Sequence, residues 1–145
     1  MNWYFDTSVL VAAAIAKHPH HAPAARLLEA LACGPHRGFL SSHGLAEVYS
    51  VLTRLPLTPR IYPNEANQII EDQILPLVEL VPLTGEEYKE IVRQAGSKGW
   101  VGGRIHDAIH LRCAAKMDCD LIYTFNFADF RALASPELAA RVAVP

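Results

Sequence analysis

Short apolar segments alternate with segments of helical periodicity along most of this sequence, and this alternation constrains the fold more than any other feature. Apolar residues recur every three or four positions after one such segment, at Leu45, Val48, Leu52 and Leu55. Alternating strands and helices are typical of an α/β domain with a mainly parallel central sheet flanked by helices. The strands are predicted at residues 3–5, 38–42, 77–83 and 121–124, with an edge strand from residues 141–145.

Helices are predicted between these strands, and several have recognisable signals at their ends. Ser41 or Ser42 is placed to cap one helix, and Thr84 is placed to cap another. Pro63 suits the first turn of a helix, and the glycine-rich segment 96–103 is predicted to be a loop. The predicted helices cover residues 8–16, 24–32, 45–55, 63–75, 86–95, 104–117 and 128–133.

Length and composition limit the classes that this chain can belong to. A chain of 145 residues with 51% hydrophobic residues predicts one globular domain over residues 1–145. The net charge of −2 gives no general signal for nucleic acid, although a local patch could still bind RNA. Three cysteines without CxxC spacing argue against a disulfide framework or a structural zinc site. We see no signal peptide and no apolar run near the roughly 20 residues that span a bilayer, so we expect a cytoplasmic protein without a membrane segment.

Polar side chains follow two of the predicted strands, where ligands bind in parallel α/β sheets. Asp6 comes directly after the first strand, and Asn126 and Asp129 follow the strand at residues 121–124. Glu47 lies on the helix after the second strand, away from the centre of its apolar stripe. Asp107 falls in the first turn of a later helix, where the helix dipole favours a negative group.

Each of these residues also has an ordinary structural explanation. Asp6 or Asp129 could cap the helix that follows it, and Glu47 could be a solvated surface residue. Asp107 could form a helical ion pair with Arg104, whose charge would favour the ionised carboxylate. The histidines of the segment "HPHH" suggest a metal site, but no further ligand is placed at helical spacing from them. We therefore expect an exposed loop there.

The order of the acidic residues along the chain favours a shared functional site over these separate structural explanations. Carboxylates gathered from separate segments repel one another and need a compensating cation, and their oxygens suit Mg²⁺ or Mn²⁺. Such a site can bind one or two ions, generate hydroxide from water and stabilise in-line displacement at a phosphodiester. The pattern therefore indicates a metal-dependent nuclease.

Four segments of the chain resemble the motifs of PIN domains, in particular the VapC toxins of toxin–antitoxin pairs. They are "FDTSVLV", "HGLAEVYSVLTRLP", "GGRIHDAIHLRCA" and "IYTFNFADFRAL", and together they span residues 5–133. The resemblance implies a three-layer sandwich with a Mg²⁺- or Mn²⁺-dependent ribonuclease site. It implies that Asp6 and Asp107 hold the metal and that Glu47 completes the acidic cluster.

One position departs from the family pattern. Many PIN domains have an acidic residue where this chain has Asn126, which can offer a carbonyl oxygen but adds no charge. Asp129, three residues further on, could supply the missing charge. Ser8 and Thr124 are expected to hydrogen-bond the carboxylates. Arg104 could contact a substrate phosphate or pair with Asp107.

The resemblance further implies an endoribonuclease that acts as a toxin, with RNA as substrate, a protein antitoxin as partner, and a homodimer. Two other functions remain open. The fold could be a non-catalytic module that binds RNA or protein, which the neutral Asn126 would permit. It could also be a structure-selective DNA nuclease, although such enzymes usually carry more acidic residues and extra helices. Trp100 could stack on a base or serve in packing.

Overall fold

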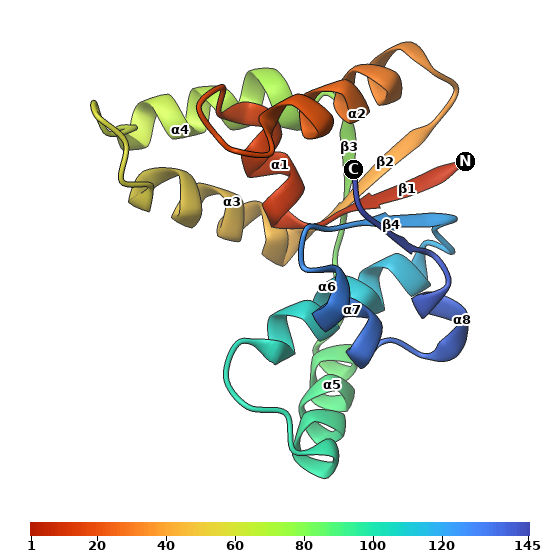
Figure 1. Cartoon of the computed structure of the whole chain (residues 1–145). Coiled ribbons are helices and arrows are strands. Elements are labelled where there is room, and N and C mark those ends of the chain that lie inside the picture. The colour runs from red at the N-terminus through yellow and green to blue at the C-terminus, as the bar shows by residue number, and fades with distance from the viewer.

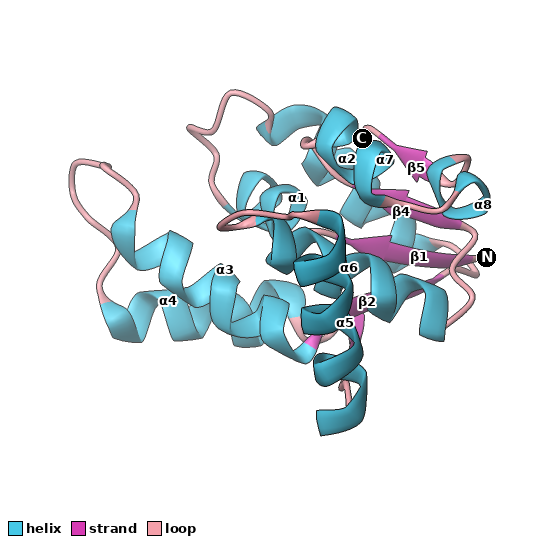
Figure 2. Ribbon diagram, turned by 90° about the horizontal axis from the view of Figure 1, so that it is seen from below, coloured by secondary structure: helices cyan, strands magenta, loops and turns pink.

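The computed structural model describes all 145 residues, and its strands form one parallel sheet. The strands are β1 (Asn2–Phe5), β2 (Arg37–Ser41), β3 (Val78–Val81), β4 (Leu121–Tyr123) and β5 (Val142–Ala143). Their order in the sheet is β3-β2-β1-β4-β5, and every pairing is parallel (Figure 2). The predicted α/β class, the parallel sheet and the C-terminal edge strand are therefore confirmed.

The seven predicted helical segments follow the strands in the predicted order, and a short helix at Pro136–Ala139 was not predicted. The helices are α1 (Thr7–Ala14), α2 (His21–Cys33), α3 (Ser42–Arg54), α4 (Pro63–Ile69), α5 (Gly85–Lys98), α6 (Arg104–Lys116), α7 (Phe127–Leu133) and α8 (Pro136–Ala139). A π-helical turn, η1 (Ile70–Ile74), continues α4 directly. No helix is both long and apolar enough to cross a membrane.

The helices lie in two layers, one on each face of the sheet (Figure 1). Helices α1 to α4 cover one face, where Trp3, Phe5 and Leu40 join the larger core cluster. Helices α5 to α8 cover the other face, where Tyr4 and Phe39 join a second cluster. Successive side chains of a strand point to opposite faces, so a strand buried on both sides must be apolar throughout. This explains the continuous apolar run of β1.

Two predicted helix caps are confirmed, and one predicted loop is partly wrong. The side chain of Ser41 accepts a hydrogen bond from the backbone N–H of Gly44 at 2.7 Å, and Thr84 accepts from Glu87 at 3.1 Å. Residues 96–98 belong to α5, because Gly96 is tolerated inside the helix. The helix ends instead at Gly99, whose φ of 70° suits a left-handed C-cap.

Gly44 and Gly96 both lie in helices, but their surroundings predict opposite effects of Gly→Ala. A Cβ on Gly44 would lie 2.7 Å from Leu40, 2.9 Å from the Ser41 hydroxyl and 3.0 Å from the His110 ring, whereas a Cβ on Gly96 would meet nothing within 4 Å. We expect Gly44→Ala to lower the free energy of unfolding by about 1–2 kcal/mol through overpacking. Gly96→Ala should raise it by roughly 0.5–1 kcal/mol. Urea denaturation of both variants measures this, and a stabilising Gly44→Ala would contradict the close approach of α3 to His110.

Candidate active site

Asp6 stands at the carboxyl end of the central strand β1, beside the point where the strand order reverses. Its backbone N–H donates to the carbonyl of Tyr123 at 3.0 Å, which continues the ladder between β1 and β4. The side chain is only 4% exposed, and its Oδ2 accepts hydrogen bonds from the hydroxyls of Ser8 at 2.7 Å and Thr124 at 2.8 Å. The Asp6 side chain makes no cap hydrogen bond to α1. The predicted contacts of Ser8 and Thr124 with a site carboxylate are thus confirmed.

Glu47 reaches the same place from the second turn of α3. Its Oε1 lies 3.4 Å from Nε2 of His110 and 3.2 Å from Nε2 of His43, and its Oε2 lies 3.5 Å from the hydroxyl of Thr7. Burial is the largest single influence and would raise the pKa of Glu47, but the imidazoles of His110, His43 and His106 together outweigh burial and lower that pKa. Glu47 is therefore half-buried and held ionised, which rules out the interpretation as a freely solvated surface residue.

A buried histidine connects Asp6 and Glu47. His110 lies on α6 and is 1% exposed, and its Nε2 is 3.5 Å from Oδ1 of Asp6 as well as 3.4 Å from Oε1 of Glu47. Because these two carboxylate oxygens are close to the same nitrogen, the distance between them cannot exceed the sum of the two distances. Nδ1 of His110 is 2.7 Å from the hydroxyl of Tyr4, which in turn accepts from the backbone N–H of Ser41 at 3.1 Å. This chain of contacts ties β1, β2, α3 and α6 together beneath the carboxylates.

The contact between His110 and Glu47 is electrostatic in character. Nε2 of His110 and Oε1 of Glu47 are both buried, and neither has a hydrogen-bond partner of good geometry. Burial lowers the pKa of His110, but Glu47 and Asp6 outweigh burial and raise it. A proton on Nε2 therefore faces the two carboxylates. We did not anticipate this network from the sequence, although His110 follows Asp107 by one helical turn and so had to share its face.

Asp107 completes the cluster from the first turn of α6. Burial is the main cause that raises the pKa of its carboxyl, with the negative charge of Asp6 second, and the resulting pKa is about 6. The alternative explanation of Asp107, a helical ion pair that favours the ionised form, is wrong, because Arg104 is exposed and does not act on the pKa of Asp107. Asp107 is half-buried and is repelled by the neighbouring carboxylates, so a bound cation would stabilise its ionised form.

Asp107 is therefore expected to destabilise the metal-free protein. Its raised pKa means that the folded state holds this proton more tightly than the unfolded state, so stability falls as the pH rises from about 4 to about 6. After allowance for solvent screening of this half-exposed group, Asp107→Asn should raise the free energy of unfolding by about 1–2 kcal/mol above pH 6. Below about pH 4 the variant should match the parent. Denaturation in metal-free buffer at both pH values checks this, and equal stability at pH 7 would contradict the described crowding of carboxylates.

Four of the five candidate residues line one cavity, and the fifth, Asp129, lies outside it. Asp6, Glu47, Asp107 and Asn126 line one cavity of about 450 Å³ at the carboxyl edge of the sheet. Asn126 is exposed, and its backbone N–H donates to the hydroxyl of Thr124 at 2.9 Å. Asp129 is exposed and does not line the cavity, although its charge contributes to the raised pKa of Asp107. Asp129 therefore lies elsewhere than Asn126 and cannot supply, at the position of Asn126, the negative charge that is missing there.

The "HPHH" segment is closer to the site than we expected. His18 and His20 line the same cavity, and the ring of His20 stacks on Phe125 with centroids 4.5 Å apart. No lysine or arginine lines the cavity. Three carboxylates with no lysine or arginine among them repel an anionic phosphodiester, since like charges repel. The donor set therefore fits a hard divalent cation, with Asp6, Asp107 and Glu47 as its available oxygen ligands.

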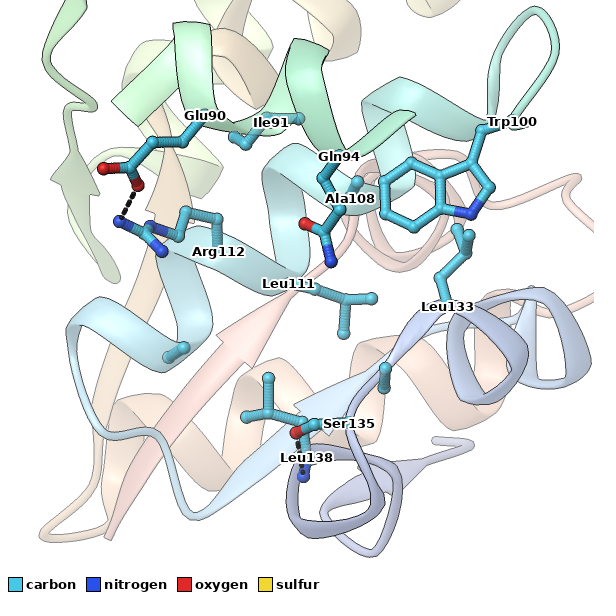
Figure 3. A pocket seen from close by; sticks show the side chains of 12 residues that line it. Glu90, Ile91, Gln94, Trp100, Ala108, Leu111, Arg112, Leu133, Ser135 and Leu138 are labelled. Carbon is cyan, nitrogen blue, oxygen red and sulfur yellow. Dashed lines mark hydrogen bonds and ion pairs between the residues drawn. The ribbon is translucent and has the colours of Figure 1, made fainter. Parts of the chain in front are cut away.

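A second, smaller cavity of about 200 Å³ lies between α5, α6 and the α7–α8 segment (Figure 3). Its lining is mostly apolar, and Glu90 and Arg112 at its edge are paired with each other at 2.8 Å. Figure 3 shows the indole of Trp100 beside Leu133 at this cavity. The position of Trp100 favours packing over contact with a base at the acidic site.

A parallel α/β sheet with carboxylates gathered at its carboxyl edge is an arrangement typical of nucleases that bind divalent cations. The family model described as "PIN domain" matches residues 3–135, and the chain belongs to this family. It is 32% identical to ribonuclease VapC27 of Mycobacterium tuberculosis H37Rv over 117 residues, which are 80% of this chain and 79% of that protein. It is 35% identical to ribonuclease VapC40 of the same species over 104 residues, 72% of each chain.

Two solved structures have the same fold. VapBC2 from Rickettsia felis, bound to a DNA fragment from its promoter, superposes with a TM-score of 0.70 at 20% identity, covering 100% of this chain and 99% of that one. Mycobacterium tuberculosis VapC20, described as a toxin that cleaves the sarcin–ricin loop, also gives 0.70 at 18% identity, covering 90% and 94%. The PIN-like sandwich and the similarity to VapC ribonucleases, both predicted from sequence, are thus confirmed.

Proposed function

We propose that this chain is a divalent-metal-dependent endoribonuclease and the toxin of a toxin–antitoxin pair. The observation that carries the proposal is the convergence of Asp6, Glu47 and Asp107, from three separate elements, on one cavity. The similarity to VapC27 and VapC40, which are ribonucleases, supports RNA as the substrate. The proposed toxin works as one domain over residues 1–145 in the cytoplasm, where its RNA substrate is found.

In this proposal Asp6 and Asp107 bind Mg²⁺ or Mn²⁺, and Glu47 is a further ligand or orients the attacking water. When bound, the cation supplies a hydroxide at neutral pH and neutralises charge on the phosphodiester. Ser8 and Thr124 hold Oδ2 of Asp6 in place. His110 holds Asp6 and Glu47 together from beneath. Asn126 offers an uncharged oxygen, and Asp129 acts from outside the cavity through its charge.

The proposed partners are an RNA, a protein antitoxin and a second copy of the chain. The Rickettsia felis structure holds a VapBC2 complex, which supports a protein antitoxin here as well. A basic side chain of that antitoxin could enter the acidic cavity, since nothing cationic lines it. Loops at residues 55–62 and 99–103 are the proposed places for RNA specificity, because phosphate contacts carry no sequence information.

The experiment that tests this function is cleavage of a structured RNA by the purified chain with and without divalent cation. We expect cleavage with Mg²⁺ or Mn²⁺ and none after chelation with EDTA. Flapped DNA, tested in parallel, should resist cleavage. Preferred cleavage of the flapped DNA would instead support a structure-selective DNA nuclease.

A non-catalytic PIN module that binds RNA or protein is the second candidate. The observation that favours it is Asn126, which leaves the cavity one charge short of the usual family pattern. Titration with Mn²⁺ separates the two functions. A binding module would show no uptake that depends on Asp6 and Asp107, and it would bind RNA equally well in EDTA.

A further inference from the structure

Two histidines and Glu47 form a compact cluster next to the acidic cavity. Nε2 of His43 lies 3.0 Å from Nδ1 of His106 and 3.2 Å from Oε1 of Glu47. One ligand atom from each residue lies within 4.8 Å of the other two. Neither histidine has a role in the nuclease site proposed above.

The fold places these three side chains together. His43 and Glu47 are four residues apart on α3 and so share one face of that helix. His106 comes from the first turn of α6, and its ring lies nearly parallel to that of His43, at an interplanar angle of 6° and a centroid separation of 5.0 Å. The close approach of α3 to α6 depends on Gly44, which has no side chain to hold the helices apart.

One oxygen atom of the cluster lacks a hydrogen bond. Oε1 of Glu47 is buried and has no hydrogen-bond partner of good geometry. A buried polar atom without a partner costs free energy, and buried carboxylate oxygens are normally hydrogen-bonded or coordinate a metal. Both histidine nitrogens that approach each other can act as metal ligands in the neutral form.

The two separations around His43 match those of a small cation site with nitrogen and oxygen ligands, and the third, between His106 and Glu47, is no more than 4.8 Å. Zn²⁺ holds histidine and carboxylate atoms at roughly 2.0–2.2 Å, so two ligands at a tetrahedral angle lie roughly 3.3 Å apart. The contacts of 3.0 and 3.2 Å around His43 are close to this value. Imidazole suits zinc and later transition metals, whereas Mg²⁺ prefers oxygen ligands alone.

We propose that His43, His106 and Glu47 form a second cation site, which binds Zn²⁺ or a similar transition-metal ion. Two histidines and one glutamate leave a fourth position for water. This site differs in ligand chemistry from the all-oxygen cluster of Asp6 and Asp107, but the two share Glu47. Zn²⁺ and Mg²⁺ therefore compete for the same carboxylate group, and each weakens the binding of the other by the same factor. Only this coupling rests on the proposed nuclease function.

The test is direct binding of Zn²⁺ to the full chain, purified without a histidine tag, by isothermal titration calorimetry. Co²⁺ serves as a second probe, because its visible absorption reports four-coordinate nitrogen and oxygen ligation. We expect one ion per chain, and Zn²⁺ should displace Co²⁺. His43→Ala and His106→Ala should each weaken Zn²⁺ binding by more than about tenfold, since loss of a supporting partner alone costs about that much.

Two control variants decide what a result means. The double variant His18→Ala/His20→Ala removes the histidines of the neighbouring loop and should leave Zn²⁺ binding within about twofold. Asp107→Asn should keep the Zn²⁺ site while it loses Mn²⁺ uptake. Loss of Zn²⁺ in the loop variant, or unchanged binding in both His43→Ala and His106→Ala, would overturn the proposal. An active Asp107→Asn nuclease would refute the proposed catalytic site and leave the Zn²⁺ result standing, so the two failures are distinguishable.

Discussion

Replacing Asp6 with Asn should lower ribonuclease activity by at least about 10³-fold, since a catalytic cation contributes several kcal/mol and each 1.36 kcal/mol is tenfold in rate. Asp6 is the most buried of the candidate ligands, at 4% exposed. An Asn side chain has nearly the same shape, and its carbonyl oxygen can still accept from Ser8 and Thr124. The variant thus keeps the fold and loses the charge.

The measurement is the initial rate of cleavage of a structured RNA at saturating Mn²⁺, with circular dichroism to show that the variant is folded. Asp72→Asn is the matched control, because Asp72 is exposed on η1 and contacts only Gln68. It should cut at the parental rate. If a folded Asp6→Asn protein cuts within tenfold of the parent, Asp6 does not bind the catalytic cation.

His110→Ala is expected to lower the free energy of unfolding by about 3 kcal/mol, through lost packing and buried groups left without partners. The ring of His110 is 1% exposed and contacts the Tyr4 hydroxyl at 2.7 Å. Its removal leaves the negative charges of Asp6 and Glu47 facing a cavity. Breaking one side of a buried charged contact is costly for that reason.

Urea denaturation in metal-free buffer measures this effect, and His106→Ala on the same helix is the control. The side chain of His106 is exposed, so this substitution should change the free energy of unfolding by less than about 0.5 kcal/mol. A double-mutant cycle with Tyr4→Phe would isolate the contact between Tyr4 and His110. If His110→Ala costs no more than His106→Ala, the buried network does not support the site.

The order of strands and helices was predictable because the apolar runs of the central strands β1 and β2 are buried on both faces of the sheet. Asp6 could be placed at the carboxyl edge of the sheet because it directly follows β1. Helix ends were less certain. Gly96 suggested a loop, but a glycine costs only about 1 kcal/mol inside a helix, and the capping box at Thr84 and the apolar face of α5 outweigh it.

The electrostatics of the site could not be read from spacing alone. The separation of Arg104 and Asp107 by three residues left an ion pair between them open, but Arg104 is exposed to solvent while Asp107 faces Asp6. The contact of Tyr4 with His110 joins residues 106 positions apart. Local sequence patterns predict which face of a helix a residue occupies. The residues that this face contacts are determined by tertiary packing.

The central claim is that Asp6 and Asp107 together bind one divalent cation, and a crystal soaked in Mn²⁺ tests it most directly. The account predicts an anomalous difference peak in the cavity, within roughly 2.0–2.6 Å of a carboxylate oxygen of both residues. The peak should vanish in Asp6→Asn crystals soaked in the same way. An ordered Mn²⁺ that contacts neither residue, or a cavity that stays free of Mn²⁺ at saturating concentration, would contradict the account.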